Sequence, residues 1–201
     1  MLYYLGQWLA DWAGPMRLLG SNIFLAGAGT ATAALLVWWL LPRYWRLLPS
    51  DRGREHAVGA AQSIGKPMSA GILFIPIFVV TAFLFVPYHP KVTGLLVCVL
   101  GAMMIGFFDD RAAGGWSEYR LGALDLLVSI GAAWFLCGGE PVSIWLPLYK
   151  EVWVVPAWLY MAGATPLLWV SINATNCTDG VDGLSASLTS MAILFLGGIL
   201  Y

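Results

Sequence analysis

The sequence predicts an all-α fold, a polytopic membrane bundle with about six transmembrane helices. Only 10% of its 201 residues are charged and 60% are apolar, whereas about a quarter of the residues in an ordinary soluble domain carry charge. The 11 Trp, 8 Tyr and 9 Phe are side chains that gather at membrane interfaces. Intervals without Asp, Glu, Lys or Arg recur along the chain. Their length is close to that of a helix that crosses the hydrocarbon core, about 20 residues. This composition excludes a soluble domain, a disordered chain, collagen and a coiled coil.

Charge and cysteine content exclude two further classes of function. The net charge of -1 provides no basic surface for nucleic acid, so we expect no nucleic-acid partner. Two His and three dispersed Cys are too few for a disulfide framework or a Cys/His zinc site.

Six charge-free intervals mark the expected helices. The fourth interval, between Asp125 and Glu140, is short for a span. We therefore expect its helix to begin near Arg120 or Leu121 and to carry Asp125 into the interfacial layer. The segment before the first interval, with Trp8 and Trp12, is expected to lie in the interface. We find no internal repeat or linker, so residues 1–201 are expected to form one membrane domain. The intervals lie between Arg17 and Arg43, Lys66 and Lys91, Lys91 and Asp109, Asp125 and Glu140, Glu151 and Asp179, and from Asp182 onward.

The basic residues predict the orientation, because short cytoplasmic loops carry an excess of Lys and Arg. The loops after the first and third predicted helices are the basic ones. The orientation therefore places residues 42–67, 109–120 and 173–183 on the cytoplasmic face, where we expect the active site. The cytoplasmic set is Arg43, Arg46, Arg52, Arg54, Lys66, Arg111 and Arg120, and the opposite set is Arg17, Lys91 and Lys150.

Two adjacent carboxylates, Asp109 and Asp110, close the third predicted helix. They repel each other and also oppose the negative end of the helix dipole. A solvated helix end is one interpretation. The other is that one or both act as a base or bind a divalent cation, which would relieve the repulsion.

A second polar segment runs from Asn173 to Leu184, with the sequence N-A-T-N-C-T-D-G-V-D-G-L. An ordinary turn explains its glycines, which allow a close approach to a ligand, but not its density of amides and carboxylates between two apolar spans. An EF-hand is excluded, because the acid spacing is wrong and no closing Glu follows. The polar members are Asn173, Asn176, Thr178, Asp179 and Asp182.

Four carboxylates and several basic side chains are thus expected on one face. Such a mixture suits a phosphorylated substrate whose charge is bridged to Asp by Mg²⁺ while Lys or Arg contacts the remaining oxygens. Zinc and iron are disfavoured, since His and Cys ligands are missing. The acids are Asp109, Asp110, Asp179 and Asp182.

These motifs resemble a known family. The run from Asn173 to Leu184 resembles the N-A-x-N-x-x-D-G-x-D-G-L signature of the polyprenyl-phosphate N-acetylhexosamine-1-phosphate transferases, and Asp109-Asp110 is similar to their Asp-Asp motif. Thr178 matches the N-x-T-D-G form of the phospho-N-acetylmuramoyl-pentapeptide-transferase branch. Residues 65–71 (G-K-P-M-S-A-G) are similar to that branch's G-T-P-T-M-G-G segment.

The resemblance implies an enzyme of the bacterial inner membrane with its active site on the cytoplasmic face. It would transfer phospho-MurNAc-pentapeptide from UDP-MurNAc-pentapeptide to undecaprenyl phosphate with Mg²⁺, giving lipid I and UMP, the first membrane step of peptidoglycan synthesis. A homodimer is also expected. By position, the resemblance implies Asp109, Asp110 and Asp179 as the catalytic and Mg²⁺-binding candidates. It also implies substrate binding by Asn173, Asn176 and Thr178, and uridine binding by Gly180, Val181 and Asp182.

The sequence departs from the family pattern at its basic positions. Lys66 and Met68 stand where the family commonly has two threonines, and Lys66 is expected to supply a charge that the family places slightly upstream. The loop after Asp110 reads R-A-A-G-G-W-S-E-Y-R instead of a lysine-rich stretch. Arg111 or Arg120 is therefore the candidate phosphate contact.

Length is the other departure, because family enzymes have about ten spans. We expect this chain to be the N-terminal part of such an enzyme and to be inactive alone. Alternatives are a sibling transferase that uses UDP-GlcNAc, a transporter or channel with an Asp-lined ion pathway, and a structural fragment that pairs with another protein.

Overall fold

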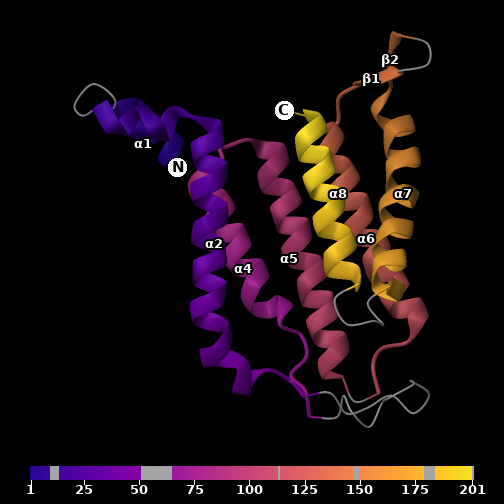
Figure 1. Cartoon of the computed structure of the whole chain (residues 1–201). Helices are drawn as coiled ribbons and strands as arrows, with labels where there is room; N and C mark the ends of the chain where they lie inside the picture. Colours follow the sequence, from indigo (N-terminus) through magenta and orange to yellow (C-terminus); the bar gives the residue numbers. More distant parts are fainter. Residues whose placement is uncertain (10–13, 51–64, 113, 147–149, 179–183, 201) are drawn as a thin grey trace. The chain divides into compact units, whose positions relative to one another are not determined.

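The computed structural model describes residues 1–9, 14–50, 65–112, 114–146, 150–178 and 184–200. The chain forms two compact units, Met1–Leu121 and Gly122–Tyr201, and each is described by itself (Figure 1).

The first unit begins with two short helices that pack on each other, α1 (Leu2–Leu9) and the 3₁₀ helix η1 (Gly14–Gly20). Gly6 is buried at their contact, and a Cβ added there would overlap Cβ of Leu19. Figure 1 shows α1 running across the axis of the long helix α2. Neither element reaches the about 20 residues of a span. Of the two tryptophans behind the interfacial prediction, Trp8 lies in α1 and Trp12 lies outside the described residues.

Helix α2 (Asn22–Tyr44) is followed by a 3₁₀ turn, η2 (Trp45–Leu47). Ser21 caps α2, since its Oγ accepts a hydrogen bond from the backbone N–H of Phe24 at 3.4 Å. Inside the apolar helix, the hydroxyl groups of Thr30 and Thr32 donate to carbonyls one turn back, at 2.8 and 2.7 Å. These polar groups are therefore satisfied without water.

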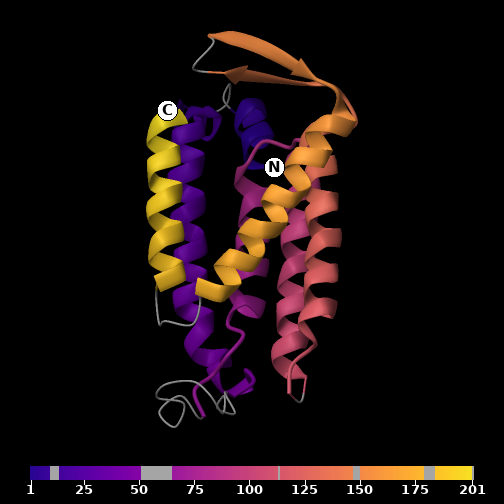
Figure 2. The ribbon, with the colours of Figure 1, turned by 90° about the vertical axis from the view of Figure 1, so that its right-hand side faces the viewer.

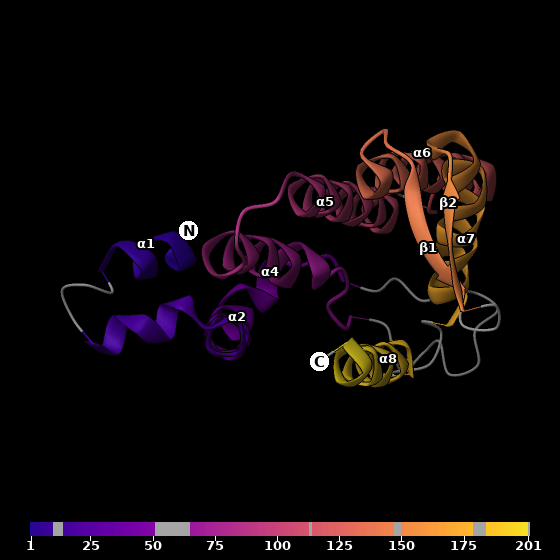
Figure 3. The same cartoon turned by 90° about the horizontal axis from the view of Figure 1, so that it is seen from above.

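Helices α4 (Gly71–Phe85) and α5 (Pro90–Arg111) complete the first unit. Helix α4 packs beside α2, and α5 packs beside α4, an order visible end-on in Figure 3. Each helix contributes one buried aliphatic side chain: Leu25, Val79 and Leu96. His89 caps α5 by accepting the backbone N–H of Lys91 on Nδ1 at 3.2 Å, and Pro90 follows it.

Helix α6 (Glu118–Cys137) leads into the second unit. It begins within three residues of the predicted start at Arg120 or Leu121. A stripe at four-residue spacing is buried: Asp125, Ser129, Ala133 and Cys137. Asp125, expected in the interfacial layer, is 5% exposed, and the Ser129 hydroxyl donates to its backbone carbonyl at 2.7 Å.

A two-stranded antiparallel hairpin follows, β1 (Val142–Leu146) and β2 (Glu151–Val155), in register from Val142 opposite Val155 to Leu146 opposite Glu151. No strand was predicted there: β1 lies between two predicted helices, and all of β2 after Glu151 lies in the interval in which a helix was expected. β-branched and aromatic residues dominate both strands, which favours extended backbone.

The hairpin leads into α7 (Ala157–Thr178), and α8 (Leu184–Leu200) ends the described chain; Figure 2 shows the passage from β2 into α7. The indole Nε1–H of Trp169 in α7 donates to the carbonyl of Gly122 in α6 at 2.8 Å. This bond ties the two helices together within the second unit.

The all-α membrane fold is confirmed, because one α-helix overlaps most of each of the six predicted intervals. By length and composition, three helical segments of the described chain are long and apolar enough to cross a membrane: Asn22–Leu47, Pro90–Arg111 and Glu118–Cys137. Helix α4 has 15 residues, a length of about 22 Å at 1.5 Å per residue. It starts five residues after Lys66, because residues 66–70 are not helical.

Candidate active site at the end of α5

The predicted Asp pair lies in the last turn of α5, where Asp109 is half-buried and Asp110 is exposed. This position agrees with the prediction that the pair closes the third long apolar helix. Arg111 follows in the same turn, and its positive charge interacts favourably with the negative end of the helix dipole. The arrangement offsets part of the cost of two adjacent carboxylates there.

The loop after α5 returns to Asp109. The backbone N–H of Trp116 donates to Oδ1 of Asp109 at 2.6 Å. Gly114 and Gly115 make this return, with φ of 86° and 72°, a region that residues with a side chain rarely adopt. A Cβ added at Gly115 would lie 3.6 Å from Oδ1 of Asp109, so the turn passes directly beside the carboxylate.

A second segment, residues 65–70 before α4, reaches Asp110. The Ser69 hydroxyl donates to Oδ2 of Asp110 at 2.6 Å. This segment is held by its main chain, since the N–H of Met68 donates to the carbonyl of Pro49 at 2.7 Å and Pro67 forms a β-bridge with Ser50. The two neighbouring carboxylates are therefore anchored by two different parts of the chain.

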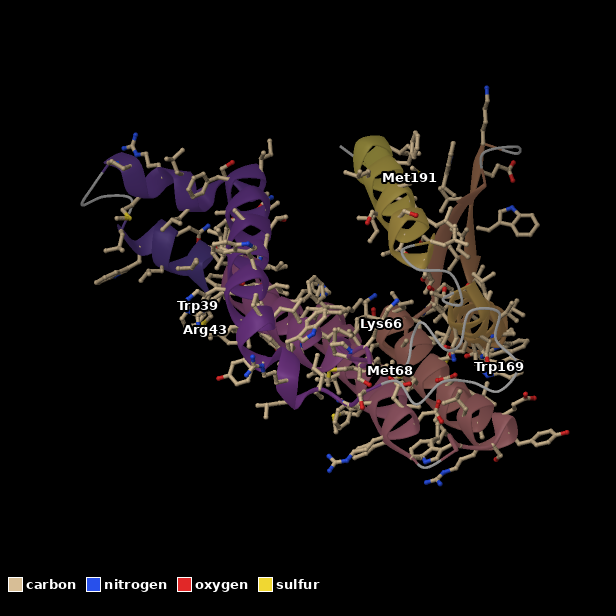
Figure 4. All side chains as sticks on the ribbon, turned by 60° about the horizontal axis from the view of Figure 1, so that its bottom comes forward. Trp39, Arg43, Lys66, Met68, Trp169 and Met191 are labelled. Carbon is tan, nitrogen blue, oxygen red and sulfur yellow. The ribbon has the colours of Figure 1, made fainter. Side chains whose placement is uncertain are left out.

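The basic residues predicted for the site differ in how firmly they are held. The guanidinium of Arg120 lies 3.9 Å from the centre of the Trp116 ring, a cation–π contact. Lys66 and Arg111 are exposed, and Lys66 lies on the same short segment as Met68 (Figure 4). Arg120 is thus joined, through Trp116, to the loop that holds Asp109.

The amide candidates belong to the second unit. Asn173 and Asn176 lie near the end of α7, which continues through Thr178. The Asn173 side chain donates one N–H of Nδ2 to the carbonyl of Trp169 at 2.8 Å, which fixes the amide on the helix while its Oδ1 can still accept a hydrogen bond. The remaining predicted site residues lie outside the described part of the chain: Asp179, Gly180, Val181 and Asp182.

Magnesium fits the donor chemistry of the Asp pair. Mg²⁺ is usually held by one or two carboxylates together with substrate phosphates and water, and Asp109 and Asp110 provide two adjacent carboxylates. Within the described residues, no group of three or more His, Cys, Asp or Glu side chains is placed to hold a metal ion. Substrate phosphates and water usually supply the other Mg²⁺ ligands, and Asp179, the third predicted ligand, lies outside the described residues.

Two residues of the site were missed by the sequence analysis, Ser69 and the backbone of Trp116. The Gly114-Gly115 pair signalled a turn after Asp110, which could have placed Trp116 near Asp109. Nothing in the sequence spacing pairs Ser69 with a residue 41 positions later.

Comparison with known proteins gives the family. A profile of glycosyl transferase family 4 matches residues 92–201. Two proteins named phospho-N-acetylmuramoyl-pentapeptide-transferase, from two strains of Treponema pallidum, are each 40% identical over 200 residues, which cover 97% of this chain and 54% of theirs. A protein of that name from Gemmatimonas aurantiaca is 31% identical over 229 aligned positions, covering 100% of this chain and 60% of its own.

The chain spans about half the length of these relatives. The profile covers more than half of its residues, and the Treponema relatives match it nearly end to end. The chain therefore belongs to glycosyl transferase family 4.

Proposed function

We propose that the full-length protein transfers phospho-MurNAc-pentapeptide from UDP-MurNAc-pentapeptide to undecaprenyl phosphate, giving lipid I and UMP. A phosphate oxygen of the lipid forms a bond to the phosphorus that carries the sugar, and the bond from that phosphorus to the bridging oxygen of UDP breaks. The proposal includes the bacterial inner membrane as its location, the cytoplasmic face as the side of the reaction, and a homodimer. The relatives are named for transfer of the phospho-N-acetylmuramoyl-pentapeptide group, which supports the donor in this proposal.

The observation that carries the proposal is the anchored carboxylate pair. Asp109 and Asp110 lie side by side in sequence, and each accepts a 2.6 Å hydrogen bond from a different segment. Phosphoryl transfer depends mainly on positioned charges around the transferring group and on a base or orienting group for the attacking oxygen. In the proposal, one of the two carboxylates orients the lipid phosphate or takes its proton.

Cations complete the proposed site. When bound, Mg²⁺ neutralises charge on the phosphate oxygens, and Asp109, Asp110 and Asp179 are the residues proposed to hold it. Arg120, stacked on Trp116, is proposed to contact the remaining phosphate oxygens, a role for which a guanidinium is well suited. Lys66 and Arg111 are exposed and are proposed as further phosphate contacts.

The second unit is proposed to bind the nucleotide. Asn173 and Asn176 stand at the end of α7, next in sequence to Thr178 and to the segment whose resemblance implies uridine binding by Gly180, Val181 and Asp182. The Oδ1 atom of Asn173 is proposed as one acceptor for the nucleotide, because the bond from Nδ2 to the Trp169 carbonyl holds the amide in place.

The test is release of UMP by the purified full-length protein, given undecaprenyl phosphate, Mg²⁺ and UDP-MurNAc-pentapeptide. We expect turnover that stops on chelation and returns with Mg²⁺, and that falls by about 100-fold or more in Asp110→Asn. Glu140→Gln is the matched control, because Glu140 is an exposed carboxylate outside the proposed site. If UMP is released from UDP-GlcNAc and not from UDP-MurNAc-pentapeptide, the protein is the sibling transferase that uses UDP-GlcNAc. No release from either donor would refute the proposal.

A further inference from the structure

The hydrogen bond between Ser69 and Asp110 joins two segments that are 41 residues apart in sequence. Asp110 is exposed at the end of a helix, where a free carboxylate would exchange among several side-chain rotamers. A donor at 2.6 Å on Oδ2 favours one of those arrangements and leaves Oδ1 to face a ligand. The bond therefore acts on the direction of the carboxylate.

The Ser69 hydroxyl is itself held in place by the main chain around it. Met68 donates its N–H to the carbonyl of Pro49 at 2.7 Å, and the carbonyl of Ser69 accepts the N–H of Ile72 at 3.1 Å at the start of α4. Ser69 has a φ of 57°, in the left-handed region that is uncommon for residues with a side chain. A backbone fixed on both sides of an unusual conformation carries the hydroxyl to Asp110.

From this geometry we infer that Ser69 is a positioning residue that orients the Asp110 carboxylate for phosphoryl transfer, an inference that rests on the proposed function. Its hydroxyl is a neutral donor to a charged acceptor, the stronger class of hydrogen bond. The family segment that residues 65–71 resemble has methionine at this position, so the role is assigned from the structure of this chain and not from the motif. Small displacements of a reacting group lower the rate strongly, which is why the loss of one such bond is measurable.

A purely structural role is the competing explanation, in which Ser69 only fastens residues 65–70 to the end of α5. The left-handed φ of Ser69 separates the two explanations. Glycine suits that backbone but has no hydroxyl, whereas threonine keeps the hydroxyl but is strained there because it is β-branched. The positioning role predicts that activity follows the hydroxyl, and the structural role predicts that activity follows the backbone.

The experiment measures kcat, both KM values and the melting temperature of full-length Ser69→Gly, Ser69→Ala and Ser69→Thr. We expect kcat to fall by about tenfold in the Gly and Ala variants, with KM for the UDP-sugar changed by less than about twofold, which is the signature of an interaction made in the transition state. Ser69→Thr should have a higher kcat than Ser69→Gly in spite of a lower melting temperature. Ser190→Ala is the control and should match the wild type, because the Ser190 hydroxyl donates to the Ala186 carbonyl within α8, away from the Asp pair in sequence.

Several outcomes would overturn the inference. These are a Gly variant with wild-type kcat, a Thr variant no better than Ala, or a loss that appears in KM alone. Turnover by the wild type keeps these results separate from failure of the proposed function, which would appear as no UMP release at all.

A double-mutant cycle on melting temperature tests the bond without using turnover. Ser69→Ala and Asp110→Ala should be non-additive, since each removes the same hydrogen bond. Additive shifts would mean that the two side chains do not interact in the full-length protein, and the inference would fall.

Discussion

The backbone N–H of Trp116 donates a 2.6 Å hydrogen bond to Oδ1 of Asp109. The loop that leaves α5 thus binds a carboxylate of the helix turn it has just left. The donor belongs to the main chain, whereas the donor to Asp110 is the side chain of Ser69. The two carboxylates of the proposed site can therefore be perturbed separately by substitution.

Asp109→Asn separates the anchoring of the loop from the charge. The amide retains an oxygen that can accept the Trp116 N–H, so the free energy of unfolding should change by less than about 1 kcal/mol. The lost negative charge should lower kcat for UMP release by about 100-fold or more. Thermal unfolding and the UMP assay on one preparation measure both quantities.

Asp109→Ala is the comparison for that variant. It removes the acceptor as well as the charge, so the N–H of Trp116 loses its partner and the variant should be less stable than Asp109→Asn. Wild-type turnover in Asp109→Asn would remove Asp109 from the mechanism.

Trp116→Ala tests the cation–π contact that carries Arg120. The substitution leaves the backbone N–H to Asp109 in place but removes the ring under the guanidinium, which lies 3.9 Å from the ring centre. An exposed contact of this kind contributes about 0.5–1 kcal/mol, so KM for the phosphate-bearing substrate contacted by Arg120 should rise by about two- to fivefold. Steady-state kinetics with each substrate varied in turn measure the change.

Two further variants sharpen this test. Trp116→Phe keeps an aromatic face and should recover most of the affinity. In an Arg120→Ala background, Trp116→Ala should have little further effect, because the contact is already absent. A fall in kcat at unchanged KM would contradict the prediction. It would mean that the Trp116 ring acts on the position of Asp109 and not on substrate binding by Arg120.

Gly6→Ala tests the packing of α1 on η1. A Cβ at residue 6 would overlap Cβ of Leu19 and lie 3.1 Å from its carbonyl carbon, so the two short helices must separate. Overpacking of this kind costs about 1–3 kcal/mol. We expect faster proteolysis and faster amide hydrogen exchange within residues 1–20, with the remainder of the chain unchanged.

Gly20→Ala is the matched control for Gly6→Ala, because a Cβ at residue 20 meets no heavy atom of the described chain within 4 Å. Its exchange pattern should resemble that of the wild type. Equal effects of the two substitutions would contradict the close contact between Gly6 and Leu19.

The positions of charged residues predict where the helices of this chain lie. The six charge-free intervals located six helices, and the Asp pair was placed at its helix end, because charged residues are costly inside a membrane. The hairpin was not predicted, because a search for membrane spans does not detect strands as short as Val142–Leu146 and Glu151–Val155. Alternation of β-branched and aromatic residues was the signal for it.

The hydrogen bonds at the Asp pair could not be predicted from the positions of charged residues, for a physical reason. The bond from Ser69 depends on a left-handed φ of 57° and on the pairing of α4 with α5, which brings together residues 41 positions apart. The bond from Trp116 depends on a local turn, for which Gly114-Gly115 was a readable sign. Local chemistry was predictable at this site, and long-range pairing was not.

Gly115→Ala tests whether the turn itself positions the donor to Asp109. Space is available, since the new Cβ would lie 3.6 Å from Oδ1 of Asp109, an ordinary contact. The backbone is the obstacle, because Gly115 has a φ of 72° and a Cβ costs about 1–2 kcal/mol in that region. The turn should relax toward negative φ and carry the N–H of Trp116 away from the carboxylate, so both the melting temperature and kcat should fall.

Gly106→Ala supplies the control for that prediction within the same helix as Asp109. A Cβ at Gly106 meets no heavy atom of the described residues within 4 Å, and the residue is helical, so alanine is tolerated there and even favoured by about 0.5–1 kcal/mol. Its kcat should equal that of the wild type. If Gly115→Ala also retained wild-type kcat while losing stability, the Trp116 bond would serve the loop alone, and Asp109 would act without a fixed donor.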